Sequence, residues 1–333
     1  MIQLTNKDRF AVFRLPGRQQ VEMYLSEAVS SVPFEDAHLK EKGYVVFPFL
    51  AEENSFFIAA DHHYINPEWS FISGEKGAIL SMSQSDYLKM IEGGIDALSS
   101  DFPKVILSRQ MLVEVKERNV TKVFNKLVKK YPDAFVFLWH LPETGTWVGA
   151  SPEPLLTSEG QCAFLSVALA GTRPIRQTSA EWGAKEVDEH QWVVHFIEDR
   201  LDTLRLPFSK GKIHTVNAGN VQHLRTDFRY NTSDPGQVIR ALHPTPAVCG
   251  LPRDEALRLI GQLEPYQRRY YTGFSGPVGQ QIHLYVTLRC MQWFDGQVCL
   301  YIGGGITRQS IPEYEWEETN WKAQTLKDVL QKV

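Results

Sequence analysis

The chain has 333 residues and lacks the features that would tie it to a membrane or to secretion. No run of roughly 18 apolar residues is present, so no segment is expected to span a bilayer. The first ten residues, MIQLTNKDRF, carry charges where a signal peptide needs an apolar stretch. The four cysteines are scattered and form no CxxC pair, which predicts reduced thiols. We therefore expect a cytoplasmic protein with no membrane partner.

The sequence also lacks a concentration of positive charge. It contains 35 lysines and arginines against 39 acidic residues, for a net charge of −4, and no basic run stands out. Because nucleic-acid binding needs a basic patch, we expect no nucleic-acid partner. Nothing in the sequence specifies an oligomer, and a monomer is the default expectation.

What the sequence does have is many strand-like runs joined by short turns, such as FDGQ at 294–297. This arrangement favours an α+β fold with antiparallel sheets over a doubly wound parallel sheet. A soft boundary near residue 80 suggests an N-terminal arm, 1–80, packed on the same body as the main part, 81–333. The expected strands are 44–50, 56–60, 104–108, 134–140, 283–294 and 297–305; the expected helices are 85–100, 121–131, 178–205, 234–242, 253–264 and 312–332.

One lysine stands where a charge is unusual. Residues 103–110 read PKVILSRQ, so Lys104 opens an apolar run of the kind that usually forms a buried strand. A lysine in such surroundings is generally solvated, paired or put to use. Lys104 is therefore a candidate for function.

A glutamate lies on the apolar face of the helix expected at 178–205, which Thr178 or Ser179 would cap. Counting back four residues from Val193, in the apolar stripe, leads to Glu189. A charge on a buried face needs a partner, although a solvated position at the end of the stripe is the alternative.

The C-terminal helix repeats this anomaly. Glu315 and Glu318 are three residues apart on one face, and about three turns later the same face carries Leu326 and Val329. Glutamates that converge from different helices form a site for a hard cation, usually Mg²⁺. The alternative is a solvated acidic first turn that favours the helix dipole.

Two weaker features lie close together in the sequence. Gly303, Gly304 and Gly305 end a strand-like run and could bring backbone N–H groups to an anion, although a bulge or tight turn explains them as well. Arg289 lies within the run HLYVTLRCMQWF, where it either faces solvent or clamps a carboxylate.

Taken together, these stretches resemble the chorismate-utilising enzymes, which include isochorismate, salicylate, anthranilate and aminodeoxychorismate synthases. The resemblance covers roughly residues 100–330, in the family's order. It rests on KVILSR (104–109), GASPEPLL (149–156), ALAGTRP (168–174), KEVDEH (185–190), ALHPTPAVCGLP (241–252), LEPYQRRYYTGFSGPVG (263–279), VTLRC (286–290), LYIGGGI (300–306) and EWEETNWKAQTL (315–326).

The resemblance implies a large α+β chorismate-binding fold, like that of anthranilate and aminodeoxychorismate synthases, with stacked antiparallel sheets and outer helices. It implies Lys104 as general base and Glu153 as general acid. It places Mg²⁺ on Glu189, Glu315 and Glu318, and the substrate carboxylates on Arg289 and the backbone of Gly303, Gly304 and Gly305. It places Ala170, Gly171, Thr172 and Tyr271 around the same pocket, with His223 nearby.

Within the family, Ala170 argues against the aminodeoxychorismate branch, which carries a nucleophilic lysine there. The form HPTPAVCGLPR is typical of isochorismate synthases, although Cys249 replaces a commoner glycine and Gln191 stands where some relatives have glutamate. We therefore expect an isomerase (EC 5.4.4.2) that converts chorismate to isochorismate with water as nucleophile, for menaquinone or siderophore biosynthesis. A salicylate synthase is the runner-up, and a non-catalytic chorismate-binding module is the alternative of another class.

Overall fold

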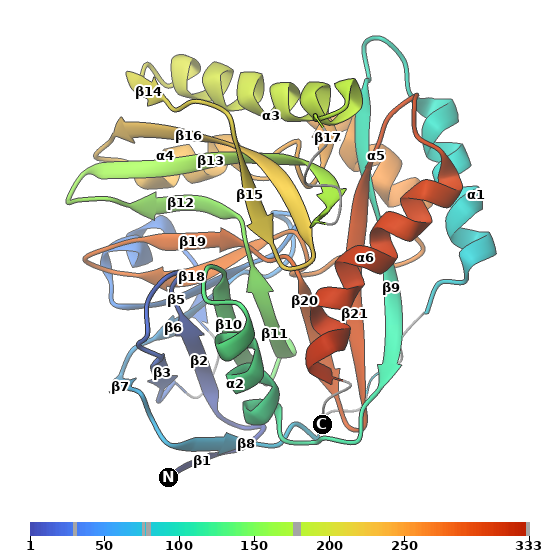
Figure 1. Cartoon of the computed structure of the whole chain (residues 1–333). Coiled ribbons are helices and arrows are strands. Elements are labelled where there is room, and N and C mark those ends of the chain that lie inside the picture. Colours follow the sequence, from blue (N-terminus) through green and yellow to red (C-terminus); the bar gives the residue numbers. More distant parts are fainter. Residues whose placement is uncertain (29–31, 75–76, 78–80, 176–180, 331–333) are drawn as a thin grey trace.

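Two large antiparallel sheets organise the chain, as the computed structural model shows in Figure 1. The structure describes residues 1–28, 32–74, 77, 81–175 and 181–330. The first sheet has nine strands, in the order β17 (Gly250–Leu251), β9 (Lys104–Glu114), β21 (Gln297–Ile306), β20 (Cys290–Phe294), β11 (Gly145–Ser151), β10 (Phe135–Leu141), β2 (Arg9–Arg14), β3 (Glu22–Ser26) and β7 (His62–Ile65).

The second sheet has ten strands. Its order is β14 (Phe208–Lys210), β16 (Val221–Asn231), β13 (Ala163–Pro174), β12 (Pro154–Ser158), β19 (His283–Val286), β18 (Phe274–Val278), β5 (Gly43–Phe47), β6 (Phe56–Ala59) and β4 (Val32–Pro33), with β15 (His214–Ala218) paired to β16. A separate parallel pair joins β1 (Ile2–Leu4) to β8 (Trp69–Phe71). Strands from the first 80 residues thus lie in both large sheets.

An aromatic core lies between the two sheets. Strands of the first sheet contribute Phe13, Phe137 and Trp147, and strands of the second contribute Tyr44 and Tyr285. All five side chains are buried. Large rings fill such a space well because each buries a large apolar area.

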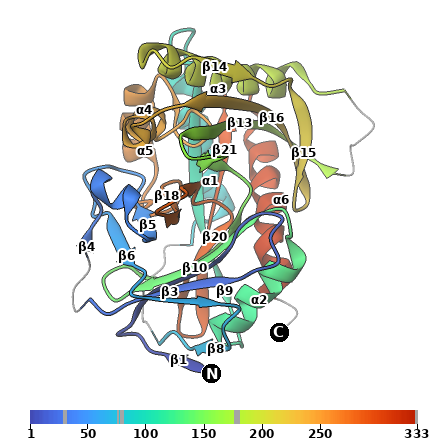
Figure 2. The same cartoon turned by 90° about the vertical axis from the view of Figure 1, so that its left-hand side faces the viewer.

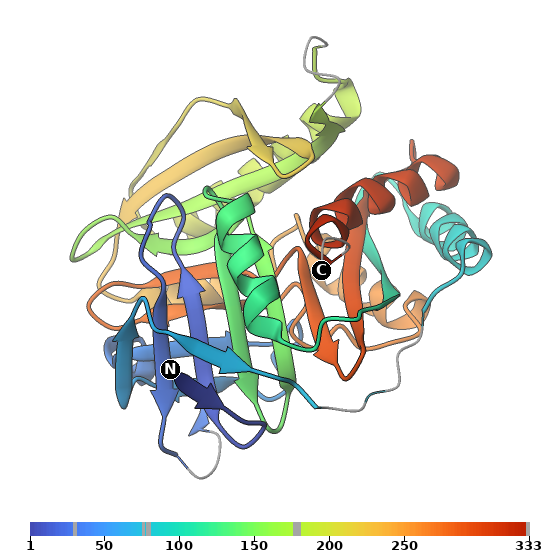
Figure 3. The same ribbon diagram turned by 60° about the horizontal axis from the view of Figure 1, so that its bottom comes forward.

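Helices cover the outer faces of the sheets. Helices α2 (Val120–Lys130) and α6 (Pro312–Leu330) pack on the first sheet, and α3 (Ala184–Thr203) and α4 (Pro235–Leu242) pack on the second. In Figures 1 and 2, α3 lies along the top over β13 and β16. Helix α1 (Gln84–Ala97) lies beside α6 in Figures 1 and 3, α5 (Arg253–Leu263) packs near β9, and a short 3-10 helix, η1, covers Asp36–Lys40. No helix within the described ranges is long and apolar enough to cross a membrane.

The run expected as one strand at 283–294 is two strands in different sheets. Strand β19 ends at Val286 and β20 begins at Cys290, and between them Arg289 has a φ of +47°. The chain thus turns a corner at Arg289, and this backbone conformation is uncommon for any residue except glycine. The prediction of a continuous strand was wrong.

The start of the long helix also differs from expectation. Within the described residues α3 begins at Ala184, with Gly183 as its N-cap, whereas a start at 178 was expected. The expected capping residues, Thr178 and Ser179, lie outside the described residues. The stretch from 181 to 183 precedes the described helix, so its residues do not belong to the first turn.

Candidate active site

A pocket lies where the two sheets meet α3 and α6. Its wall contains all but one of the residues that the sequence predicted for the site: Lys104, Glu153, Ala170, Gly171, Thr172, Glu189, His223, Tyr271, Arg289, Gly303, Gly304, Gly305 and Glu318. The exception is Glu315, which is buried directly behind Gly304. Residues separated by more than 200 positions in the chain therefore face one space.

Lys104 is the first residue of β9 and is 1% exposed. Its Nζ lies 4.0 Å from Oε2 of Glu189. Burial lowers the pKa of Lys104, and Glu189 opposes this shift. The backbone at Lys104 is closely covered, because a Cβ on Gly250 would lie 2.5 Å from the Lys104 carbonyl oxygen. Lys104 is thus an amine held away from water and inclined toward its neutral form.

Glu153 lies between β11 and β12 and is 4% exposed. Its carbonyl oxygen accepts a hydrogen bond from the Val286 N–H (2.9 Å), which fixes this short connection to β19. Burial raises the pKa of Glu153 to about 8, against the opposing effect of Lys104. At neutral pH this carboxyl group carries a proton and can act as an acid.

Three buried glutamates lie next to the pocket, on α3 and α6. Glu189 is 8% exposed, Glu315 0% and Glu318 7%, which confirms that all three lie on buried helical faces. Burial, and next Glu318, raises the pKa of Glu315 to about 7. Burial also pushes the pKa of Glu318 upward, but Lys322 and other cations outweigh it, so that the pKa is lowered. These carboxylates need cations close by.

Lysines supply those cations in the structure. Lys185 Nζ lies 2.7 Å from Oε1 of Glu315, and Lys322 Nζ lies 2.7 Å from Oε1 of Glu318. Sequence reasoning assigned no role to either lysine, although Lys185 precedes Glu189 by four residues and Lys322 follows Glu318 by four. Lys322 also lines the pocket and donates to the Gly303 carbonyl oxygen (2.9 Å).

The acidic group has the donor chemistry of a magnesium site. Oε2 of Glu315 is buried without a hydrogen-bond partner, and carboxylate oxygens are ligands that Mg²⁺ prefers. Gly304 leaves space there, since a Cβ on it would lie 3.4 Å from Oε2 of Glu315 and 3.5 Å from Oε1 of Glu318. Among the described residues, however, no three His, Cys, Asp or Glu side chains form a ready-made metal site. The carboxylate oxygens suit a hard divalent cation in their chemistry, but the ammonium group of Lys185 lies among them.

Arg289 contributes a further positive charge to the pocket wall. Its guanidinium donates to Oγ1 of Thr325 (3.2 Å) and lies 3.3 Å from Nε2 of His223. Nδ1 of His223 lies 2.9 Å from the Gly171 carbonyl oxygen, which can only accept, so Nδ1 carries the proton. Burial, and next Arg289, lowers the pKa of His223 to about 3. His223 is therefore neutral and orients Arg289.

Glycines allow the walls to close around this space. Gly171 has a φ of +71°, in an irregularity of the β13–β16 pairing. A Cβ there would lie 2.9 Å from the Glu186 carbonyl oxygen. A Cβ on Gly303 would lie 2.9 Å from the hydroxyl oxygen of Tyr271, whose ring stacks on Tyr301 with centroids 5.5 Å apart.

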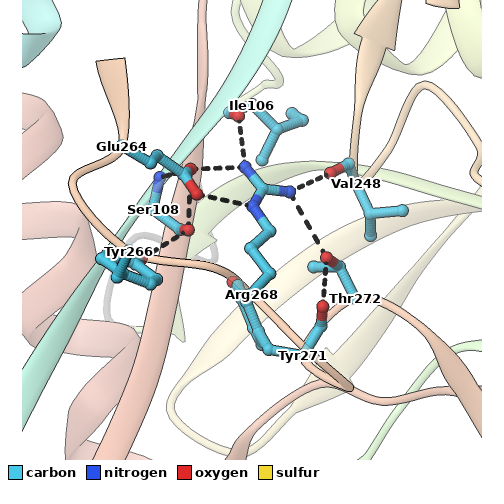
Figure 4. Close-up of polar contacts among 8 residues, drawn as sticks. All are labelled: Ile106, Ser108, Val248, Glu264, Tyr266, Arg268, Tyr271 and Thr272. Carbon is cyan, nitrogen blue, oxygen red and sulfur yellow. Dashed lines mark hydrogen bonds and ion pairs between the residues drawn. The ribbon is translucent and has the colours of Figure 1, made fainter. Parts of the chain in front are cut away.

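A buried ion pair supports the pocket from behind (Figure 4). Arg268 donates to both carboxylate oxygens of Glu264, at 2.6 and 2.8 Å. The same guanidinium donates to the carbonyl oxygens of Ile106 and Val248, two pocket residues. Glu264 in turn accepts from the backbone N–H and the hydroxyl of Ser108. One pair thus ties β9, the segment around Val248 and the turn before Tyr271 together.

Comparison with known proteins shows the family of the chain. The sequence profile of a family described as chorismate binding enzyme matches residues 68–331. The chain belongs to this family. The family description names chorismate as the ligand that its members bind.

Individual members of the family are similar over much of this chain. A vibriobactin-specific isochorismate synthase of Vibrio cholerae is 33% identical over 250 residues, which make up 68% of this chain and 62% of that protein. Isochorismate synthase EntC of Escherichia coli K12 is 32% identical over 246 residues, with the same shares. The chain thus spans about 62% of the length of these relatives.

Solved structures confirm the predicted fold. DhbC from Bacillus anthracis, described as a 2,3-dihydroxybenzoate-specific isochorismate synthase, superposes with a TM-score of 0.82 at 25% identity and covers 98% of this chain and 97% of its own. The menaquinone-specific MenF of Escherichia coli has a TM-score of 0.83 at 21% identity, covering 97% of this chain and 89% of its own. The chorismate-binding α+β fold, with stacked antiparallel sheets, is therefore shown.

Proposed function

We propose that this chorismate-binding protein is an isochorismate synthase, which exchanges the C4 hydroxyl of chorismate for a hydroxyl at C2. The observation that carries the proposal is that Lys104 and Glu153 line the same pocket, with pKa values displaced in opposite directions. A lysine with a lowered pKa is suited to act as a base, and a glutamate with a raised pKa is suited to act as an acid. The names of the similar proteins support the same reaction.

In the proposed reaction, Lys104 accepts a proton from a water molecule that attacks C2 of the ring. The diene shifts, and Glu153 donates its proton to the C4 hydroxyl, which leaves as water. One water enters and one leaves, so the reaction is an isomerisation and is reversible. Afterwards Lys104 is protonated and Glu153 ionised, and a proton must return to Glu153 before the next turnover.

Water is the proposed nucleophile because the position at which aminodeoxychorismate synthases carry a nucleophilic lysine holds a residue here that cannot attack. Residue 170 lines the pocket and is alanine, whose methyl group cannot attack. Gly171 and Thr172, which follow it, also line the pocket, and His223 is neutral with its Nδ1 proton directed at Gly171. This arrangement supports hydration at C2 over attack by a side chain.

The two carboxylates of chorismate need separate cationic partners. Arg289 and Lys322, both on the pocket wall, supply positive charge for them, and a guanidinium can bind a carboxylate through two hydrogen bonds. Glu189, Glu315 and Glu318 would hold Mg²⁺. When bound, Mg²⁺ would neutralise the ring carboxylate and draw electron density from the diene.

The test is to incubate the purified protein with chorismate and Mg²⁺ in ¹⁸O-labelled water and to separate the products. Isochorismate that carries the label at C2, in a constant ratio to chorismate, is the expected result. Accumulation of salicylate and pyruvate would make the protein a salicylate synthase, and an absence of product with retained chorismate binding would make it a non-catalytic binding module. The similar proteins serve both siderophore and menaquinone biosynthesis, so the proposal names isochorismate as the product and assigns no pathway to it.

A further inference from the structure

Lys185 connects two of the three buried glutamates. It is the second residue of α3, and its Nζ lies 2.7 Å from Oε1 of Glu315 on α6 and 4.0 Å from Oε1 of Glu189 on its own helix. A single ammonium group thus lies between carboxylates of two helices. This is the position that a cation shared by the two helices would take.

The helix itself gives no reason for a lysine at this position. The N-terminus of a helix carries partial positive charge, so a lysine in the first turn is disfavoured there. A lysine that precedes a glutamate by four residues is also the weaker orientation of this ion pair. The benefit of Lys185 therefore lies in the carboxylates, above all in Glu315 on the other helix.

Lys185 is also the lysine that can leave most easily. Its side chain is 21% exposed, compared with 2% for Lys104 and 13% for Lys322. Lys322 is further held by the Gly303 carbonyl oxygen, whereas Lys185 donates a hydrogen bond to Glu315 and lies 4.0 Å from Glu189. The second oxygen of Glu315, Oε2, is buried and has no hydrogen-bond partner. Glu315 is thus incompletely satisfied even with Lys185 in place.

We propose that Lys185 is the counter-ion of Glu315 and Glu189 in the metal-free protein, and that it must swing out to solvent before a divalent cation can bind there. Lys185 then lowers the affinity for the metal and keeps the carboxylates from repelling one another in its absence. This inference rests on the magnesium site of the proposed function. It makes Lys185 a positioning residue and assigns it no contact with substrate.

The test measures metal binding to the full chain without substrate. Mn²⁺ is the probe, titrated by electron paramagnetic resonance, and Mg²⁺ is titrated by calorimetry. Lys185→Met should bind Mn²⁺ at least roughly tenfold more tightly than the wild type, because the competing charge is gone. Lys185→Arg, which keeps the charge, should bind no more tightly than the wild type. Lys129→Met, an equal loss of charge at an exposed position on α2, should leave the affinity unchanged.

A second readout uses the melting temperature. Without metal, Lys185→Met should melt below the wild type, since buried carboxylates lose a cation, and saturating Mg²⁺ should raise its melting temperature by more than it raises that of the wild type. Lys185→Gln keeps a hydrogen-bond donor without the charge and replaces the methionine variant if that variant does not fold.

Three outcomes separate the possibilities. Unchanged or weaker Mn²⁺ binding by Lys185→Met and Lys185→Gln, with a wild type that binds the metal, would overturn the role of Lys185 and leave the magnesium site intact. A wild type that binds neither ion and stays active after chelation would overturn both. Tighter binding by the uncharged variants together with an unchanged arginine variant supports displacement.

Discussion

Arg268 and Glu264 form a two-pronged ion pair from which water is excluded, with side chains 1% and 2% exposed. Removing one member of such a pair leaves the other charge buried and alone, which typically costs about 3–5 kcal/mol of stability. The pair also fixes backbone carbonyls at Ile106 and Val248, so its loss should reach the pocket.

We therefore expect Arg268→Met to lower the free energy of unfolding by about 3–5 kcal/mol in urea denaturation. The matched control is Arg258→Met on α5, which breaks an exposed pair with Glu255 and should cost about 1 kcal/mol or less. In a double-mutant cycle, Glu264→Leu with Arg268→Met should cost less than the sum of the single changes. Equal costs for Arg268→Met and Arg258→Met would contradict this.

Lys104→Ala should lower kcat about 10²–10⁴-fold, which is the usual cost of losing a general base. Lys104→Arg should be similarly inactive, because an arginine does not give up its proton. Both are measured by the rate of isochorismate formation, with circular dichroism as the check on folding. Near-normal turnover of the folded alanine variant would remove Lys104 from the proposed mechanism.

The pH dependence of kcat/KM should have a descending limb at high pH. Glu153 must be protonated to act as an acid, and its pKa is raised to about 8, so activity should fall as the pH rises through that value. At low pH activity should fall as well, because Lys104 then holds its proton and cannot accept another. A kcat/KM that still rises two units above the Glu153 pKa, with the protein folded, would contradict this assignment.

Gly305→Ala should reduce activity with little effect on folding. The added methyl carbon would lie 3.1 Å from Cε of Lys104 and 3.3 Å from Oε2 of Glu189. Gly261→Ala is the control, because a methyl group there meets nothing within 4 Å and α5 should gain about 0.4–1 kcal/mol of stability. Steady-state rates and melting curves of the two variants test this. Equal activities would show that the space next to Lys104 is not needed.

Activity should require a divalent cation, and Glu189→Ala, Glu315→Ala and Glu318→Ala should each raise the Mg²⁺ concentration needed for half-maximal rate. The physical reason is the loss of a carboxylate oxygen that the hard cation prefers. Glu317→Ala, an exposed change on the same helix, should leave the requirement as it is. Full activity after exhaustive chelation would refute the requirement.

Much of the candidate site could be predicted from helical periodicity and from the resemblance of the sequence to chorismate-utilising enzymes. Counting by helical turns predicted that Glu189, Glu315 and Glu318 are buried, and the apolar run predicted that Lys104 is buried; the structure confirms all four. These predictions succeeded because burial of a face is a local property of a repeating pattern. The roles of the four residues remain predictions.

Other features depend on contacts that no local pattern contains. The run 283–294 has uniform strand character, so the corner at Arg289 becomes visible only when its two halves join different sheets. The pairing of Lys185 with Glu315 joins two helices across 130 positions, and the ties from Arg268 to β9 span 162. Contacts between residues so far apart in the sequence are determined by tertiary packing, which the sequence does not show directly.

Substitutions of the three glycines at 303–305 should separate the functions of the pocket. Each substitution there adds atoms toward a different neighbour: at 303 toward the Tyr271 hydroxyl, at 304 toward the carboxylates of Glu315 and Glu318, and at 305 toward Lys104 and Glu189. Missense changes in three consecutive codons should therefore give three separable phenotypes, one in substrate affinity, one in metal requirement and one in turnover.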